Sequence, residues 1–153
     1  MSTPIPATSG DPSPEQSIAR RGERVRFSDF AFTRTHSGQC TSDVELEYEG
    51  RKVVGHASGQ SSPLGDLRVA ADAALRALES FADGALGFEL IGVKLIRAFD
   101  ANLVIVSVGM RGDGTQTTRL VGCYLAESDT RRGASIAVLN ATNRILGNYI
   151  ATR

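Results

Sequence analysis

The sequence predicts an α+β fold in which a βββα unit occurs twice, each unit forming an antiparallel meander sheet covered by one helix. Two observations favour this prediction. Three strand patterns are followed by one helix pattern, and the same order then repeats. Residues also match between the halves at a constant spacing, with 51–56 over 118–123, Ala70 over Ala137, Ala74 over Ala141 and Ala31-Phe32 over Ala98-Phe99. One unit cannot cover its own sheet, so two are expected to share a core, and chance similarity of two α+β halves is the alternative.

The first repeat is expected over about residues 25–83. Residues 27–35 alternate loosely as a strand, and Val44, Leu46 and Tyr48 alternate with acidic residues as a strand with one wet face. Glu49-Gly50 predicts a hairpin turn into a third strand over residues 51–57. Small polar residues and Pro63 then indicate a helix that ends at Asp83-Gly84. Its apolar face is Leu67, Ala70, Ala71, Ala74, Ala77, Leu78 and Phe81.

The second repeat is expected over about residues 88–150. Residues 88–99 predict a strand, Asp100-Ala101-Asn102 a turn, and residues 103–110 a strand that is apolar on both faces. A strand of that kind is expected to be covered on both sides. Residues 117–125 return as the third strand, and Asp129 begins a long helix reaching about Ile150. The turn between the first and second strands is expected to be longer in repeat one. The turn between the second and third strands is expected to be longer in repeat two. Turns are where insertions are tolerated.

Residues 1–24 form a segment of different composition. They carry four of the five prolines together with Ser, Thr and charged residues, and they show no apolar period. Such a segment cannot bury enough surface to fold, so it predicts a disordered tail. Residues 25–153 are expected to form a single domain, because a chain of 153 residues suits one core.

Charge and cysteine content limit the classes of partner. Lys and Arg number 17 and Asp and Glu number 17, so no long-range field draws in nucleic acid or a membrane surface. No apolar run approaches the roughly 20 residues that span a bilayer, and the N-terminus lacks the layout of a secretion signal. We therefore expect a cytoplasmic protein with no membrane partner. Cys40 and Cys123 cannot form a disulfide framework and are expected to be small buried or half-buried thiols.

The last helix carries two apolar stripes. The first is Ala134, Ala137, Val138, Ala141 and Ile145, and the second is Ile136, Leu139, Leu146 and Ile150. A helix that is apolar on two sides needs two partners, so one stripe should pack on the sheet and the other on another helix or a second subunit. We expect a homodimer or higher homo-oligomer whose interface contains Ile136, Leu139, Asn143, Leu146 and Ile150.

Residues 128–146 (SDTRRGASIAVLNATNRIL) resemble the closing helix of the regulatory domain of 2-isopropylmalate synthase, most specifically at residues 139–144. A second similarity lies at residues 59–74, where the family has a Gly-rich turn, a proline and an Ala-rich helix. The family's architecture is also a duplicated βββα unit, so the resemblance covers about residues 25–150. It implies a leucine-sensing, dimerising domain without chemistry of its own, and the catalytic TIM barrel of the whole enzyme is expected to be absent.

The two helix starts are the candidate effector site. Ser61-Ser62 and Ser128-Asp129 follow equivalent strands, where free N–H groups and the helix dipole favour a negative group. The carboxylate of a small amino or keto acid would sit at one helix start, while Asp129 or Glu127 would meet an ammonium group. The candidate effector-binding residues are Gly59, Ser61, Ser62, Glu127, Ser128 and Asp129, and simple capping of the helices is the alternative.

The sequence offers no catalytic constellation. Only His36 and His56 are present, and no spacing typical of a metal site occurs, so no catalytic residue, metal or cofactor is expected. Ser58 is displaced by one position from the centre of a Gly-x-Ser-x-Gly motif and is interpreted as a turn residue. Residues 109–114 contain three glycines but join two strands, whereas a phosphate-binding loop needs a helix behind it.

The sequence leaves two alternatives to effector sensing and homodimerisation. Residues 66–147 have the helix, three strands, helix order of a double-stranded RNA-binding domain, but Arg131 and Arg132 lie beside Asp129 and Glu127, which disfavours a grip on phosphates. The other alternative is a structural or assembly subunit, with residues 1–24 tethering the chain to a larger protein complex.

Overall fold

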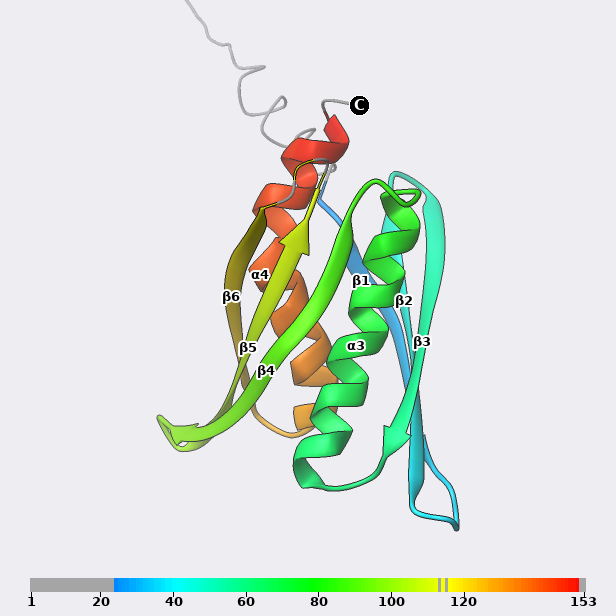
Figure 1. The fold of residues 1–153 in the computed structure, drawn as a ribbon. Coiled ribbons are helices and arrows are strands. Elements are labelled where there is room, and N and C mark those ends of the chain that lie inside the picture. Colours follow the sequence, from blue (N-terminus) through cyan, green and yellow to red (C-terminus); the bar gives the residue numbers. More distant parts are fainter. Residues whose placement is uncertain (1–23, 113, 115, 152–153) are drawn as a thin grey trace, which may run out of the picture.

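The computed structural model describes residues 24–112, 114 and 116–151, except for the side chains of residue 144 and residues 146–151. The predicted tail therefore lies outside the described residues, apart from Arg24. The elements, labelled as in Figure 1, are β1 (Arg26–Arg34), β2 (Gln39–Tyr48), β3 (Arg51–Gln60), α3 (Pro63–Phe81), β4 (Gly87–Ala98), β5 (Ala101–Arg111), β6 (Thr117–Ala126) and α4 (Thr130–Ala151).

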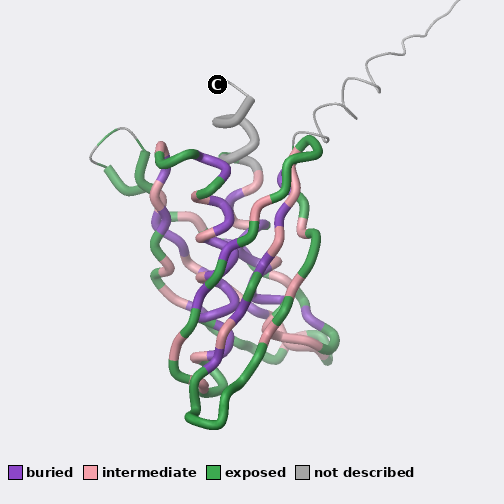
Figure 2. Tube along the Cα trace, turned by 90° about the vertical axis from the view of Figure 1, so that its right-hand side faces the viewer, coloured by how far each residue is buried: buried purple, intermediate pink, exposed green. Residues whose placement is uncertain are grey.

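Two antiparallel three-stranded sheets are each followed by one helix, which confirms the predicted α+β fold of duplicated βββα units. The strand orders are β1-β2-β3 and β4-β5-β6. Helix α3 packs on β2 and β3 of its own sheet and on β4 of the other sheet, while α4 packs on β5, β6 and β1. The two helices also contact each other, so they form a layer between the sheets (Figure 1). The buried residues gather in this central layer (Figure 2).

The duplication extends to an irregularity in the strand pairing. In β1 the register shifts between Phe27 and Asp29, opposite Leu46 and Glu45 of β2. In β4 it shifts between Leu90 and Gly92, opposite Val108 and Ser107 of β5. A bulge bends its strand at one defined position, and both repeats carry it at the same point of the meander. Chance similarity between two α+β halves does not account for this correspondence.

Gly55 and Gly122 show how each helix is seated on its sheet. A Cβ atom on Gly55 would lie 2.1 Å from the oxygen of Ala73 and 2.3 Å from the nitrogen of Ala77. A Cβ atom on Gly122 would lie 2.3 Å from the oxygen of Ala137 and 2.4 Å from the nitrogen of Ala141. The absence of a side chain therefore lets the helix backbone contact the third strand in both repeats.

These contacts correct part of the predicted residue matching. The match between residues 51–56 and 118–123 agrees with the two equivalent glycines. The matches of Ala70 with Ala137 and Ala74 with Ala141 are wrong, because Ala73 and Ala77 occupy the corresponding places. Helix α3 has about one more turn before it crosses its glycine than α4 has. A constant spacing along the sequence cannot detect this difference.

The match of Ala31-Phe32 with Ala98-Phe99 is also wrong. Phe30 pairs with Val44, and Val93 pairs with Val106, at equivalent places after the bulge. Phe32 therefore corresponds to Leu95, and Phe99 lies in a turn. The cause is the unequal turns: residues 35–38 join the first two strands of repeat one, whereas Phe99 and Asp100 join those of repeat two. The predicted difference in turn length between the repeats is thereby confirmed.

Of the two tight hairpin turns, one lies where the sequence predicts it and the other lies at different residues. Glu49 and Gly50 form the predicted turn between β2 and β3, with φ values of 51° and 80°. The turn predicted at residues 100–102 is instead Phe99-Asp100, with φ values of 55° and 58°, and Ala101 already belongs to β5. Two-residue hairpins of type I′ need positive φ at both central residues, which Asn, Asp and Gly adopt readily and phenylalanine does not.

Helix α3 is buried on more than the predicted face. Its apolar stripe is buried as expected, and Val69, Ala73 and Leu75 are buried as well. A helix apolar nearly all round needs cover on two sides, and α3 obtains it from the two sheets. Ser62 caps the start of the helix by accepting a hydrogen bond from the Gly65 N–H at 2.8 Å, and the proline follows it directly, as predicted.

Helix α4 finds its second partner within the chain. Ala134, Ala137 and Val138 of the first stripe are fully buried, while Ile145 is exposed. In the second stripe Leu139 is buried and Ile136 is half-buried. The other helix, α3, contacts α4, which was one of the two predicted possibilities. The side chains of Leu146 and Ile150 lie outside the described residues.

The expectation that residues 103–110 are covered on both sides is wrong for the single chain. Val104, Val106 and Val108 are fully buried beneath the helix layer. On the opposite face Leu103 and Ile105 are only half-buried, and the neighbouring Cys123 is exposed. The prediction that both cysteines are at least half-buried therefore holds for Cys40 and fails for Cys123. No helix among the described residues is long and apolar enough to cross a membrane.

Candidate functional site

The starts of the two helices lie at the same end of the molecule and share one cavity. Helices α3 and α4 run in the same direction in Figure 1, and each follows the third strand of its repeat. The cavity between their first turns has a volume of about 550 Å³. We call it the helix-start cavity, and its lining residues are Arg34, Pro63, Asp66, Leu67, Leu95, Ser128, Asp129, Thr130 and Arg131.

A buried carboxylate, Asp66, forms one wall of the helix-start cavity. Its side chain is 3% exposed and lies in the first turn of α3. Arg34, at the end of β1, donates to one oxygen of Asp66, and the Ser61 hydroxyl donates to the other at 2.8 Å. The Nε of Arg34 also donates to the Ser61 hydroxyl at 3.2 Å. The three residues therefore join β1 to the start of α3.

The environment of Asp66 keeps it ionised. Burial by itself would raise the pKa of Asp66, but hydrogen bonds from Arg34, Ser61 and Cys40 together lower this pKa below its usual range. The same pairing raises the pKa of Arg34. Burial, assisted by hydrogen bonding to Asp66, raises the pKa of the Cys40 thiol. At neutral pH the cluster therefore holds one carboxylate, one guanidinium and a neutral thiol.

The start of α4 forms the opposite wall. Asp129 caps this helix: one carboxylate oxygen accepts from the backbone N–H groups of Arg131 and Arg132, at 3.1 and 3.3 Å. The Nε of Arg131 lies 3.4 Å from the same oxygen, and its guanidinium lies 4.7 Å from the ring centroid of Phe32. The aromatic ring of β1 thus orients Arg131 at the mouth of the cavity.

The lining contains the groups that recognise a small zwitterion. Arg34 and Arg131 are cations suited to a carboxylate, and Asp66 and Asp129 are anions suited to an ammonium group. Leu67 and Leu95 supply apolar surface. Pockets for small molecules combine apolar walls with a few polar groups that fix orientation.

Three of the sequence-predicted effector residues belong to this region. Ser128 and Asp129 line the helix-start cavity, and Ser61 bonds to the Asp66 cluster behind it. Ser62 acts as the cap of α3. Glu127 lines a smaller neighbouring cavity of about 340 Å³ together with Ser128 and Asp129, and Gly59 lines a different cavity altogether.

Sequence reasoning missed Arg34, Asp66, Leu95 and Arg131 as lining residues. Asp66 carried a usable signal, because it is an acidic residue next to the apolar stripe of the predicted helix. Arg34 and Leu95 come from the first strands of the two different repeats. Arg34 and Leu95 lie at the same cavity only because the two repeats pack together, and no local sequence pattern predicts this.

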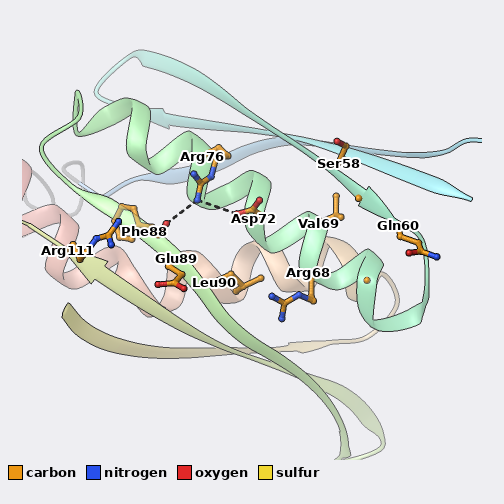
Figure 3. Close-up of a pocket in the computed structure, with 12 residues that line it drawn as sticks. Ser58, Gln60, Arg68, Val69, Asp72, Arg76, Phe88, Glu89, Leu90 and Arg111 are labelled. Carbon is orange, nitrogen blue, oxygen red and sulfur yellow. Dashed lines mark hydrogen bonds and ion pairs between the residues drawn. The ribbon is translucent and has the colours of Figure 1, made fainter.

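A second cavity, of about 650 Å³, lies between α3, the end of β3 and β4 (Figure 3). Arg76 lines this cavity and donates to the carbonyl of Phe88 at 3.1 Å, while pairing with Asp72 at 3.3 Å. Glu79 pairs with Arg76 at 3.0 Å and accepts from the Phe88 N–H at 2.8 Å. These side chains already bind one another and the backbone of β4. We therefore interpret this cavity as part of the contact between the two repeats and not as a binding site.

The two histidines lie away from both cavities. His36 is exposed, and the Nδ1 of His56 lies 2.6 Å from Asp43 on the outer face of the first sheet. Within the described part of the chain, no group of three or more His, Cys, Asp or Glu side chains is placed to hold a metal ion. Compared with known proteins, the sequence matches neither a protein-family model nor a curated protein.

Proposed function

We propose that this chain is a non-catalytic effector-binding and homodimerisation domain, similar in role to the regulatory domain of 2-isopropylmalate synthase. The effector is a small α-amino acid with an apolar side chain, or the corresponding keto acid, bound in the helix-start cavity. One observation carries the proposal: a single cavity collects both helix starts, two arginines, two carboxylates and two leucines.

The proposed pose assigns each part of the ligand to a wall. The ligand carboxylate lies between Arg34 and Arg131, where the dipoles of both helices add to the two positive charges. The ammonium group lies against Asp129, whose second carboxylate oxygen accepts no hydrogen bond from the described residues. The side chain of the ligand packs on Leu67 and Leu95.

The direct test is a thermal-shift panel on the purified protein. Leucine, isoleucine, valine and their keto acids are compared with glycine and lysine. A ligand at about 100 times its Kd adds about 2.7 kcal/mol, which raises the thermal midpoint by roughly 10 °C for a domain of this size. Amino acids that stabilise more than their keto acids support the ammonium contact at Asp129. If no branched amino or keto acid changes the midpoint at millimolar concentration, effector binding is refuted.

Arg131 and Arg132 provide a matched pair of variants. Both lie in the first turn of α4, and each places its guanidinium over a phenylalanine ring, at 4.7 Å from Phe32 and 4.9 Å from Phe27 respectively. Only Arg131 lines the helix-start cavity. Arg131→Gln should therefore abolish the ligand-induced shift, while Arg132→Gln should preserve it at a similar stability of the free protein. Equal effects of the two variants would argue against the cavity as the binding site.

A further inference from the structure

The outer faces of the two sheets differ although their backbones correspond. Directly opposed residues in neighbouring strands share a face of the sheet. Val44 opposes Gly55 in the first sheet, and Val106 opposes Gly122 in the second. The adjacent outward pair Asp43 and His56 therefore corresponds to Ile105 and Cys123. This equivalence allows the two outer faces to be compared position by position.

The outer face of the first sheet is charged and internally paired. Asp43 pairs with His56 at 2.6 Å, Glu45 with Lys52 at 3.7 Å, and Glu47 with Arg26 at 3.1 Å. Only one large apolar side chain, Val54, is strongly exposed on this face, at 58%. Water solvates the charged side chains of this face, so the face does not need to pack against another element or protein.

The outer face of the second sheet is apolar toward its β4–β5 hairpin, where Ile105 and Cys123 replace Asp43 and His56, whereas Glu89 and Arg119 lie at its other end beside Gly109. Leu103 and Leu125 replace Thr41 and Ser58, and Ile96 replaces Thr33. Val121, the counterpart of Val54, is 64% exposed. We call this surface the β4–β6 outer face, and its apolar residues are Ile91, Ile96, Leu103, Ile105, Val121, Cys123 and Leu125.

The β4–β6 outer face is comparable in size to the largest apolar patch that a typical monomeric domain exposes. Three strands spaced about 4.8 Å apart and about six residues long give roughly 300 Å² in projection. The largest apolar patch of a monomeric protein is often a functional surface. The residues come from all three strands, so the patch is continuous across the sheet.

We propose that the β4–β6 outer face docks against the same face of a second copy of this chain. The inference rests on the homodimerisation part of the proposed function and names its surface. The charged side chains of this face lie at its margins: Lys94 on the edge strand β4, and Glu89 and Arg119 at one end beside Gly109. The centre of the face therefore offers no charge pattern for a charged partner, whereas a second copy presents an apolar surface of the same shape across a twofold axis.

The area that would be buried and the character of the first sheet both favour a second copy of this chain as the partner of the β4–β6 outer face. Two such faces together with their rims bury on the order of 1,000 Å², which is the lower range for a specific interface, so a dimer that dissociates on dilution is expected. The charged outer face of the first sheet is a poor partner surface, because burying its ion pairs against an apolar face costs desolvation free energy that no new contact offsets. Residues 1–23 contain only Met1, Ile5 and Ile18 as large apolar residues, too few to cover the patch.

The test uses equivalent substitutions on the two sheets. Val121→Lys places a charge on the β4–β6 outer face, and Val54→Lys places the same charge at the corresponding position of the first sheet, opposite Glu45. Sedimentation over about 1 to 500 μM should show a dimer whose Kd rises about 30-fold or more in Val121→Lys and changes little in Val54→Lys. Leu125→Lys should act like Val121→Lys, and circular dichroism of the dissociated chains confirms that each variant is folded.

Cys123 provides an independent readout without any substitution. Its thiol is exposed in the single chain, whereas Cys40 is fully buried. The rate of alkylation by iodoacetamide should therefore fall as the concentration of protein rises and the dimer forms. A monomer whose Cys123 is protected would mean that another part of the same chain covers the face, and this would overturn the inference.

The remaining outcomes separate this inference from the proposed function. A dimer that Val121→Lys and Leu125→Lys leave intact uses another surface, so the inference fails while homodimerisation stands. A chain that is monomeric at every concentration, with reactive Cys123, refutes both the surface and homodimerisation. Neither result affects the ligand-induced thermal shift, which tests effector binding alone.

Discussion

At the scale of single residues, the fold depends on positions where a side chain is absent or where a charge is buried. Gly55 and Gly122 let a helix backbone lie directly on a strand, at distances that no Cβ atom can share. Asp66 is the one fully buried acidic side chain among the described residues. Both the glycine contacts and the buried carboxylate depend on a few atoms, so single substitutions can test them.

Replacing Gly122 with alanine should destabilise the protein by about 3 kcal/mol or more. The new Cβ would lie 2.3 Å from a helix carbonyl oxygen and 2.4 Å from a helix nitrogen, and backbone atoms cannot move aside as a flexible side chain can. Gly55→Ala should act in the same way. Gly87→Ala is the control, because its Cβ would meet only the end of the Arg111 side chain at 3.7 Å. Urea unfolding measures the free energies, and a mild effect at Gly122 would contradict the tight contact.

Asp66→Asn should cost about 2 kcal/mol at neutral pH, because it weakens the hydrogen bonds from Arg34 and Ser61 to a charged group. The folded pKa of Asp66 is lowered, so its contribution is fully present above the unfolded pKa of about 3.9 and is lost as pH falls through the folded pKa. The stability difference between wild type and Asp66→Asn should therefore shrink below about pH 4.

Urea unfolding at a series of pH values checks this behaviour. Asp43→Asn serves as the control, since Asp43 belongs to an exposed pair and should change stability by less than about 1 kcal/mol at neutral pH. A difference between wild type and Asp66→Asn that stays constant down to pH 2 would show that the ionised form of Asp66 does not stabilise the fold.

At the scale of elements, turns and helix starts carry most of the specific chemistry. Each helix begins with a side-chain cap, Ser62 for α3 and Asp129 for α4, and the two starts meet at one cavity. The two tight hairpins have the same geometry but different residues. Glu49-Gly50 suits positive φ, whereas Phe99-Asp100 places a bulky aromatic residue there.

Phe99→Asn should raise the free energy of unfolding by about 0.5 to 1 kcal/mol. Phe99 is 89% exposed with φ of 55°, so it loses no buried contact and is relieved of an unfavourable backbone conformation. Thermal unfolding at a concentration low enough to keep the chain monomeric measures the effect. A loss of stability would instead show that the positive φ of Phe99 does not strain the turn.

At the scale of the whole molecule, the two repeats depend on each other through the helix layer. The Ser135 hydroxyl of α4 donates to the Ala70 carbonyl of α3 at 2.8 Å, and both residues are buried. Arg76 and Glu79 of α3 bond to the backbone of Phe88 in β4. Each helix thus covers its own sheet and part of the other repeat, so neither sheet has a complete core alone.

Fragments carrying one repeat, residues 24–85 or residues 86–153, should therefore not fold in isolation. A unit of about 60 residues buries too little apolar surface to offset its chain entropy, and here each would also expose one side of its helix. Circular dichroism should show little structure for either fragment and a gain of signal when the two are mixed. Cooperative unfolding of one fragment by itself would contradict the shared core.

The local patterns of the sequence determined the order of the elements, the fold class, the helix caps and one of the two tight hairpins. These features depend on residues two to four positions apart, whose periodicity can be read along the chain. The tertiary structure decided the seating of α3 on Gly55, the meeting of Arg34 and Leu95 at the helix starts, and the exposure of the β4–β6 outer face. Those features depend on how elements far apart in the sequence pack against one another. Turns of unequal length set this packing, and the periodicity of nearby residues does not encode it.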